Sequence, residues 1–147
     1  MALQDLYRSA VLDHNKNPRN FLELDDASHF SRGLNALCGD DIRVYLSVED
    51  DRITRLSFIG QASAITMASA SMMTEQLMGA ALPQARQLSS QLDQLLTGEV
   101  DDALREAIGT LSALEGVRQY PSRIKAARLP WQTMLAALEG DSVATTE

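Results

Sequence analysis

The sequence contains one cysteine, no run of basic side chains and more acidic than basic residues. A single cysteine, Cys38, excludes an internal disulfide framework and any site that needs two thiolates from one chain. The 13 Lys and Arg residues are outnumbered by 20 Asp and Glu residues, which gives a formal charge of −7. Nucleic-acid binding requires clustered basic residues, so we expect no nucleic-acid partner.

The sequence also lacks a clear membrane span and an export signal. Residues 1–13 include Asp5 and Asp13 and have no apolar core of the kind that a secretory signal contains. The uncharged stretch 56–74 is nearly long enough to cross a bilayer, but it contains many Ser, Thr and Gln side chains. We therefore expect no membrane association and, because the chain has one free thiol, a reducing cytoplasm.

Hydrophobic periodicity predicts an α+β fold, in which a small antiparallel sheet packs against several helices within a single domain over residues 1–140. A chain of 147 residues with 45% hydrophobic residues can bury a core of this kind without cross-links. A polar C-terminal tail is expected over residues 141–147. The spacing predicts helices over residues 3–14, 63–78, 83–96, 101–111 and 124–138. Alternation predicts strands over 42–48 and 53–58, joined by a turn at 49–51, with a third strand over 30–34 at their edge.

Several short motifs follow one another along most of the chain. They are Asp5-Leu6-Tyr7, Asp13-His14, Asn17-Pro18-Arg19-Asn20, Cys38-Gly39-Asp40, Phe58-x-Gly60 followed by residues 64–75, Gly116-Val117-Arg118, Pro121-x-Arg123-Ile124-Lys125 and Leu129-x-Trp131. This series resembles the U-type iron–sulfur cluster assembly scaffold family, which comprises IscU, SufU and the N-terminal domain of NifU. The Arg123-Ile124-Lys125 segment and the long helical region 83–114 resemble the SufU branch.

The resemblance implies a SufE/NifU-like fold and a metal site built from three cysteines and an aspartate. Cys38 and Asp40 occupy two of these positions, whereas Ser63 and Ala126 stand where the second and third cysteines are expected. A neutral hydroxyl is a poor ligand for zinc or iron, and a methyl group offers no donor. The family implies zinc or an iron–sulfur cluster, but we expect this chain to bind neither in isolation with its remnant pair, Cys38 and Asp40.

Each of these residues also has a plainer interpretation. A lone cysteine such as Cys38 is often a small buried hydrophobe, although the resemblance implies that it accepts sulfur from a cysteine desulfurase. Asp40 fits a turn before the following strand as well as it fits a site. Ser63 is most simply the N-cap of the helix that follows it, and Ala126 is compatible with any helix.

A small basic cluster stands out in the acidic sequence and consists of Arg118, Arg123, Lys125 and Arg128. It is either a solvated helix face or a docking surface for an acidic partner, since complementary charge orients association. His14 and His29 invite comparison with a Cys–His dyad, but no nucleophile motif accompanies them. We therefore expect no independent catalysis.

Two functions remain open at this stage. In the first, the chain is an iron–sulfur cluster assembly protein of the SufU/IscU type, degenerate in metal binding, which acts as a scaffold or sulfur acceptor with a SufS-like cysteine desulfurase. In the second, it is a non-catalytic pseudo-scaffold that binds and modulates a desulfurase or an intact scaffold.

Overall fold

Alternating hydrophobic and polar residues form two long strands that meet at a tight turn. The computed structural model describes residues 2–146, and in it β2 (Asp40–Glu49) pairs antiparallel with β3 (Arg52–Gln61). Asp50 and Asp51 connect them with positive φ angles of 51° and 59°. A two-residue hairpin turn requires this left-handed backbone so that its twist matches that of the strands. The predicted hairpin is therefore present, and each strand end extends one to three residues beyond the predicted range.

The sheet has four strands in the order β3-β2-β1-β4. Strand β1 (His29–Asn35) pairs antiparallel with β2, and β4 (Val143–Thr145) pairs parallel with β1. The predicted antiparallel pairs are present, and β4 adds a parallel pair at one edge, where part of the expected polar tail forms a strand. Three residues are too few to display the alternation that reveals a strand in sequence.

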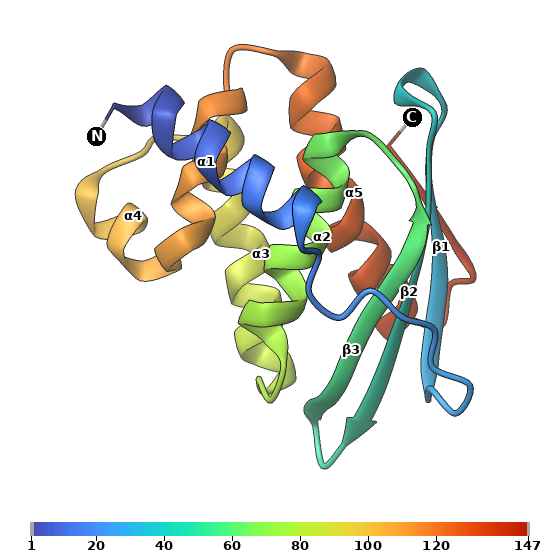
Figure 1. Ribbon diagram of the computed structural model, residues 1–147. Coiled ribbons are helices and arrows are strands. Elements are labelled where there is room, and N and C mark those ends of the chain that lie inside the picture. Colours follow the sequence, from blue (N-terminus) through green and yellow to red (C-terminus); the bar gives the residue numbers. More distant parts are fainter. Residues whose placement is uncertain (1, 147) are drawn as a thin grey trace.

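The helices lie together on one face of the sheet (Figure 1). Each predicted helix is present, and every boundary differs by three residues or fewer. The fourth helix is shorter than predicted and continues as a long 3-10 segment. The helical elements are α1 (Leu3–Lys16), α2 (Ala64–Leu77), α3 (Leu82–Thr97), α4 (Asp102–Ile108), η2 (Gly109–Val117) and α5 (Pro121–Leu138). No helix within residues 2–146 is long and apolar enough to cross a membrane.

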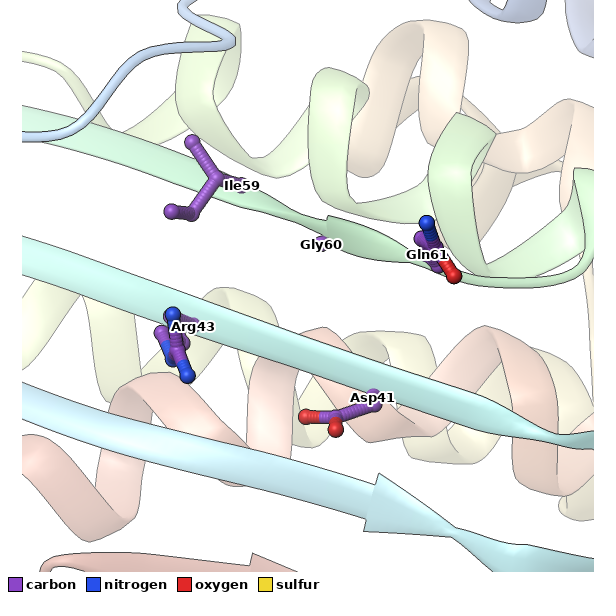
Figure 2. Close-up of a pocket in the computed structure, with 5 residues that line it drawn as sticks. All are labelled: Asp41, Arg43, Ile59, Gly60 and Gln61. Carbon is purple, nitrogen blue, oxygen red and sulfur yellow. The ribbon is translucent and has the colours of Figure 1, made fainter.

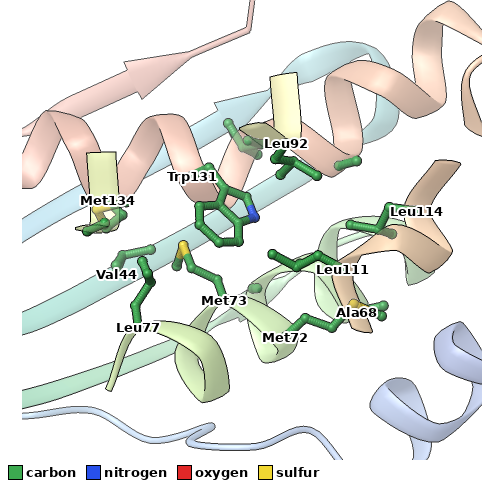
Figure 3. Close-up of a cluster of buried hydrophobic side chains, with 14 of the residues drawn as sticks. Val44, Ala68, Met72, Met73, Leu77, Leu92, Leu111, Leu114, Trp131 and Met134 are labelled. Carbon is green, nitrogen blue, oxygen red and sulfur yellow. The ribbon is translucent and has the colours of Figure 1, made fainter. Parts of the chain in front are cut away.

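The core lies between the sheet and helices α2, α3 and α5, with η2 closing one end (Figure 3). Trp131 on α5 is almost fully buried, and its indole Nε1 donates to Ser69 Oγ on α2 over 3.1 Å. Ala68 and Ala70 on α2 are also fully buried. Small side chains let α2 pack closely against its neighbours, as its composition predicted. The first residues of α2 lie beside the turn that carries Cys38.

Candidate functional site

Cys38 lies on a surface turn between strands β1 and β2. The turn is a short 3-10 helix, η1 (Ala36–Cys38), which ends at Gly39 with a φ of +69°. The Cys38 side chain is half-buried, and its Sγ lies 3.9 Å from the carbonyl oxygen of Ser122 at the start of α5. The neighbouring Leu37 is 73% exposed. Cys38 is therefore at the surface and not in the core, as its proposed role as a sulfur acceptor requires.

Asp40 is buried at the first position of β2, and both oxygens of its carboxylate accept hydrogen bonds. Oδ1 accepts the backbone N–H of Ser63 over 2.6 Å, and Oδ2 accepts the hydroxyl of Thr66 over 2.6 Å. Asn35 adds a longer contact of 3.4 Å from its Nδ2 to Oδ2. The carboxylate thus binds the N-terminal end of α2, where a negative charge is stabilised, and also contacts Asn35 at the start of its own turn.

Ser63 occupies the N-cap position of α2, but its side chain does not cap the helix. Its Oγ lies 3.0 Å from Thr66 Oγ1, and no capping hydrogen bond to a backbone N–H is formed. The expectation that the Ser63 hydroxyl caps α2 is therefore wrong.

Ala126 is buried on α5 and contributes only its backbone to this region. Its carbonyl oxygen lies 3.2 Å from Thr66 Oγ1. Thr66 thus contacts the segments of Asp40, Ser63 and Ala126 at once, and we call these four residues the Asp40–Thr66 junction. Sequence reasoning missed Thr66, although a hydroxyl one turn into the helix after Ser63 was the signal that could have identified it.

The donors around the junction do not fit a zinc ion or an iron–sulfur cluster. One thiol and one carboxylate are available, and that carboxylate already accepts two short hydrogen bonds. Structural zinc takes about four ligands, and clusters are held by several thiolates. Within residues 2–146, no three His, Cys, Asp or Glu side chains form a group that could hold a metal ion. The donors of the described residues therefore do not complete a zinc or cluster site.

The basic cluster divides into two pairs. Arg118 donates to the carbonyls of Leu95 and Gly98 at the C-terminal end of α3, and Arg128 binds Asp93 over 2.8 Å. These two side chains therefore take part in packing within the chain.

The other pair, Arg123 and Lys125, lies in the first turns of α5 close to Ser122, the residue whose carbonyl contacts Cys38. Both side chains are exposed. The Arg123 guanidinium lies 4.5 Å from the centre of the Tyr120 ring, and Tyr120 is itself 44% exposed. An aromatic ring that supports a cation in this way fixes its position at the surface.

The two histidines bind partners other than Cys38. The Nδ1 atom of buried His14 lies 2.7 Å from Ser71 Oγ on α2, and the Nδ1 atom of His29 lies 2.8 Å from Ser28 Oγ. Burial, reinforced by the nearby Arg19 guanidinium, lowers the pKa of His14 below its ordinary value. His14 is therefore neutral near pH 7, and its contact with Glu75 at 3.7 Å is not an ion pair there.

A shallow pocket of about 180 Å³ lies on the outer face of the sheet (Figure 2). It is lined by Asp41, Arg43, Ile59, Gly60 and Gln61, where β2 begins and β3 ends. Asp41 already forms a two-point ion pair with Arg32. Because side chains alternate along a strand, the pocket faces away from Asp40 and is separate from the junction.

Comparisons with known proteins agree with the motifs. Residues 6–127 match the sequence model of the family described as NifU-like N terminal domain. The chain is 38% identical over 133 residues to the zinc-dependent sulfurtransferase SufU of Bacillus subtilis, covering 90% of this chain and 88% of that protein. It is 31% identical over 139 residues to the iron-sulfur cluster assembly scaffold protein IscU of Thermotoga maritima, covering 95% and 96%.

A solved structure shows the same architecture. The crystal structure of FiSufU from Fervidobacterium islandicum superposes with a TM-score of 0.84 at 27% identity, over 92% of this chain and 98% of that one. The resemblance predicted from the motifs is thereby confirmed, both in sequence and in fold. The chain belongs to the family of NifU-like N-terminal domains.

Proposed function

We propose that this chain works in iron–sulfur cluster assembly as a metal-free sulfur acceptor for a SufS-like cysteine desulfurase. The observation that carries the proposal is the placement of Cys38. Its thiol lies on a surface turn, while the adjacent Asp40 is bound to protein donors. The names of the relatives, a zinc-dependent sulfurtransferase and a cluster assembly scaffold, support sulfur transfer in cluster assembly, whereas the metal-free form is argued from the donors of this chain.

Sulfur transfer requires one thiolate and no bound metal. The Cys38 thiolate attacks the outer sulfur of a desulfurase persulfide, and a new sulfur–sulfur bond forms at Cys38. The sulfur–sulfur bond of the desulfurase breaks, and its cysteine leaves as a thiolate. No oxidant is consumed, and the chain acts as a co-substrate without independent catalysis. A reducing cytoplasm would keep Cys38 in the thiol form that this step needs.

The partner surface that we propose surrounds Cys38 and consists of Leu37, Tyr120, Arg123 and Lys125. The two apolar side chains are exposed, and the two cations suit an acidic surface on the desulfurase. Arg118 and Arg128 contribute indirectly, because their contacts with α3 hold the segment that carries the other two. Of the four basic residues that the sequence suggested for docking, we therefore propose that only Arg123 and Lys125 contact the desulfurase directly.

The test is a transfer assay with a purified SufS-type desulfurase, L-cysteine and a metal chelator. Intact-mass spectrometry should detect one added sulfur atom on the wild-type chain and none on Cys38→Ser. The double variant Arg123→Glu, Lys125→Glu should slow the transfer. Arg43→Glu, an exposed cation on the outer face of the sheet, is the matched charge control. A wild-type chain that binds the desulfurase but gains no sulfur would contradict the proposal.

The pseudo-scaffold alternative is favoured by one observation, the closed junction around Asp40. A chain whose ligand positions are bound to each other can occupy a desulfurase without building a cluster. The Cys38→Ser variant separates the two functions. If that variant still changes the turnover of the desulfurase as strongly as the wild type does, the chain acts as a modulator and not as an acceptor.

A further inference from the structure

A proline inside α5 leaves a backbone carbonyl without its helical partner. Pro130 lies in the middle of the helix and has no N–H to donate, so the carbonyl of Ala126, four residues earlier, loses its usual hydrogen bond. The hydroxyl of Thr66 on α2 approaches that carbonyl at 3.2 Å. One turn further along α2, Ser69 Oγ donates to the carbonyl of Ala127 over 2.6 Å. Hydroxyls of α2 thus contact the part of α5 where Pro130 removes a helical hydrogen bond.

Thr66 differs from Ser69 because it also binds a charged group. Its side chain is fully buried, and Oγ1 lies 2.6 Å from Asp40 Oδ2. A hydroxyl carries one proton, and a carboxylate is a stronger acceptor than a carbonyl. Thr66 therefore donates mainly to Asp40, while its oxygen lies within reach of the Ser63 hydroxyl at 3.0 Å.

The Asp40–Thr66 junction connects three segments that are distant in sequence. They are the turn that carries Cys38, the start of α2 and the middle of α5. These are the segments where the family resemblance places the metal ligands. Here Asp40 joins the turn to α2 through hydrogen bonds from Ser63 and Thr66, and the Thr66 hydroxyl lies 3.2 Å from the Ala126 carbonyl on α5. We propose that Thr66 is a positioning residue for Cys38, because its hydroxyl fixes the turn through Asp40 without any metal.

The geometry explains how Thr66 acts on a thiol that it does not touch. Asp40 lies two residues after Cys38, and the Cys38 Sγ contacts Ser122, which is one helical turn before Ala126 on α5. If the hydroxyl of Thr66 is lost, the buried carboxylate of Asp40 loses a strong donor. The turn then loosens from α2 and α5, and the half-buried thiol becomes more accessible. This inference rests on the proposed function, in which Cys38 is the acceptor.

The test measures how fast Cys38 reacts with a maleimide in Thr66→Val, Thr66→Ser and Ser69→Ala. Thr66→Val should react several-fold faster than the wild type, and Thr66→Ser should restore the wild-type rate. Ser69→Ala is the matched control, because it removes a hydroxyl from the same helix interface without touching Asp40. It should keep the wild-type rate even if its melting temperature falls. Should Thr66→Val not fold, Asp40→Asn weakens the same junction.

Each result of this test either supports or overturns the positioning role of Thr66. A wild-type rate in Thr66→Val, or an equal increase in Ser69→Ala, would overturn the positioning role. Zinc alone should leave the rate at which wild-type Cys38 reacts with maleimide unchanged. If zinc slows this reaction, the turn binds a metal ion, and the inference of a metal-free turn is overturned. The sulfur-transfer assay is independent of the maleimide rate. If the rates change as expected but the wild-type chain accepts no sulfur, the proposed function fails while the structural role of Thr66 stands.

Discussion

Restoring two thiols should convert the junction into a metal site. Ser63 and Ala126 both lie next to Thr66, and Ala126 is one helical turn from the residue that Cys38 contacts. We therefore expect the double substitution Ser63→Cys, Ala126→Cys to give a site of four ligands with Cys38 and Asp40. Structural zinc with four ligands contributes about 10–16 kcal/mol in small peptides.

The existing hydrogen bonds oppose this gain. Asp40 accepts two at 2.6 Å, and a hydrogen bond to a charged group contributes about 1.5–3 kcal/mol, so releasing both costs about 3–6 kcal/mol. The net free energy is then about 4–13 kcal/mol, and a value near the middle corresponds to a Kd of about 1 μM. Adding Thr66→Val should tighten binding about 10- to 150-fold, since it removes one competing bond of about 1.5–3 kcal/mol.

Competition with a chromophoric zinc chelator near neutral pH measures these affinities, and circular dichroism checks that each variant is folded. The single variants Ser63→Cys and Ala126→Cys are the controls, because each supplies only three ligands. A folded double variant that binds zinc no more tightly than the wild type would refute the reasoning. The segments of Cys38, Asp40, Ser63 and Ala126 would then not converge on one point.

Three further predictions concern stability in urea or heat. Arg118→Met should lower the free energy of unfolding by about 1–3 kcal/mol because carbonyls of α3 lose their donor, whereas exposed Arg8→Met should have little effect. Burial and Arg19 lower the pKa of folded His14, so stability should fall as the pH drops below about 6.5, where the unfolded state binds more protons. A His14→Gln variant should show a weaker dependence, and an equal one would contradict this cause. Gly60→Ala should lower the melting temperature, because its Cβ would lie 2.3 Å from a backbone oxygen of β2 at a φ of +145°; an unchanged value would contradict that backbone geometry.

Much of the fold could be predicted because its signals are local. The hairpin follows from alternation on either side of Asp50 and Asp51, and the helices follow from the spacing of their apolar residues. The turn with Cys38 was identified by the order of the motifs. Strand β4 could not be predicted, since its pairing with β1 depends on contacts made more than a hundred residues apart in sequence.

The parts of the site that were missed depend on such long-range contacts too. Nothing local to Arg118 indicates that it binds the end of α3, because its acceptors lie 20 to 24 residues earlier. Thr66 resembles any other small residue of α2 until α5 is packed against it. The position of Pro130 in the middle of α5, and the Thr66 hydroxyl that approaches the Ala126 carbonyl, are seen only in the structure.

Strand β4 also has a practical consequence for handling the protein. It covers the edge of β1, where Arg32 N donates to the Ser142 carbonyl over 2.9 Å and Thr146 N donates to the Leu34 carbonyl over 3.3 Å. A version shortened at residue 140 would leave the backbone N–H of Arg32 and the carbonyl of Leu34 without these partners, directly before the turn that carries Cys38. Bare strand edges pair with edges of other chains, so such a shortened protein would tend to self-associate beside its own thiol, and a purification tag is better placed at the opposite terminus.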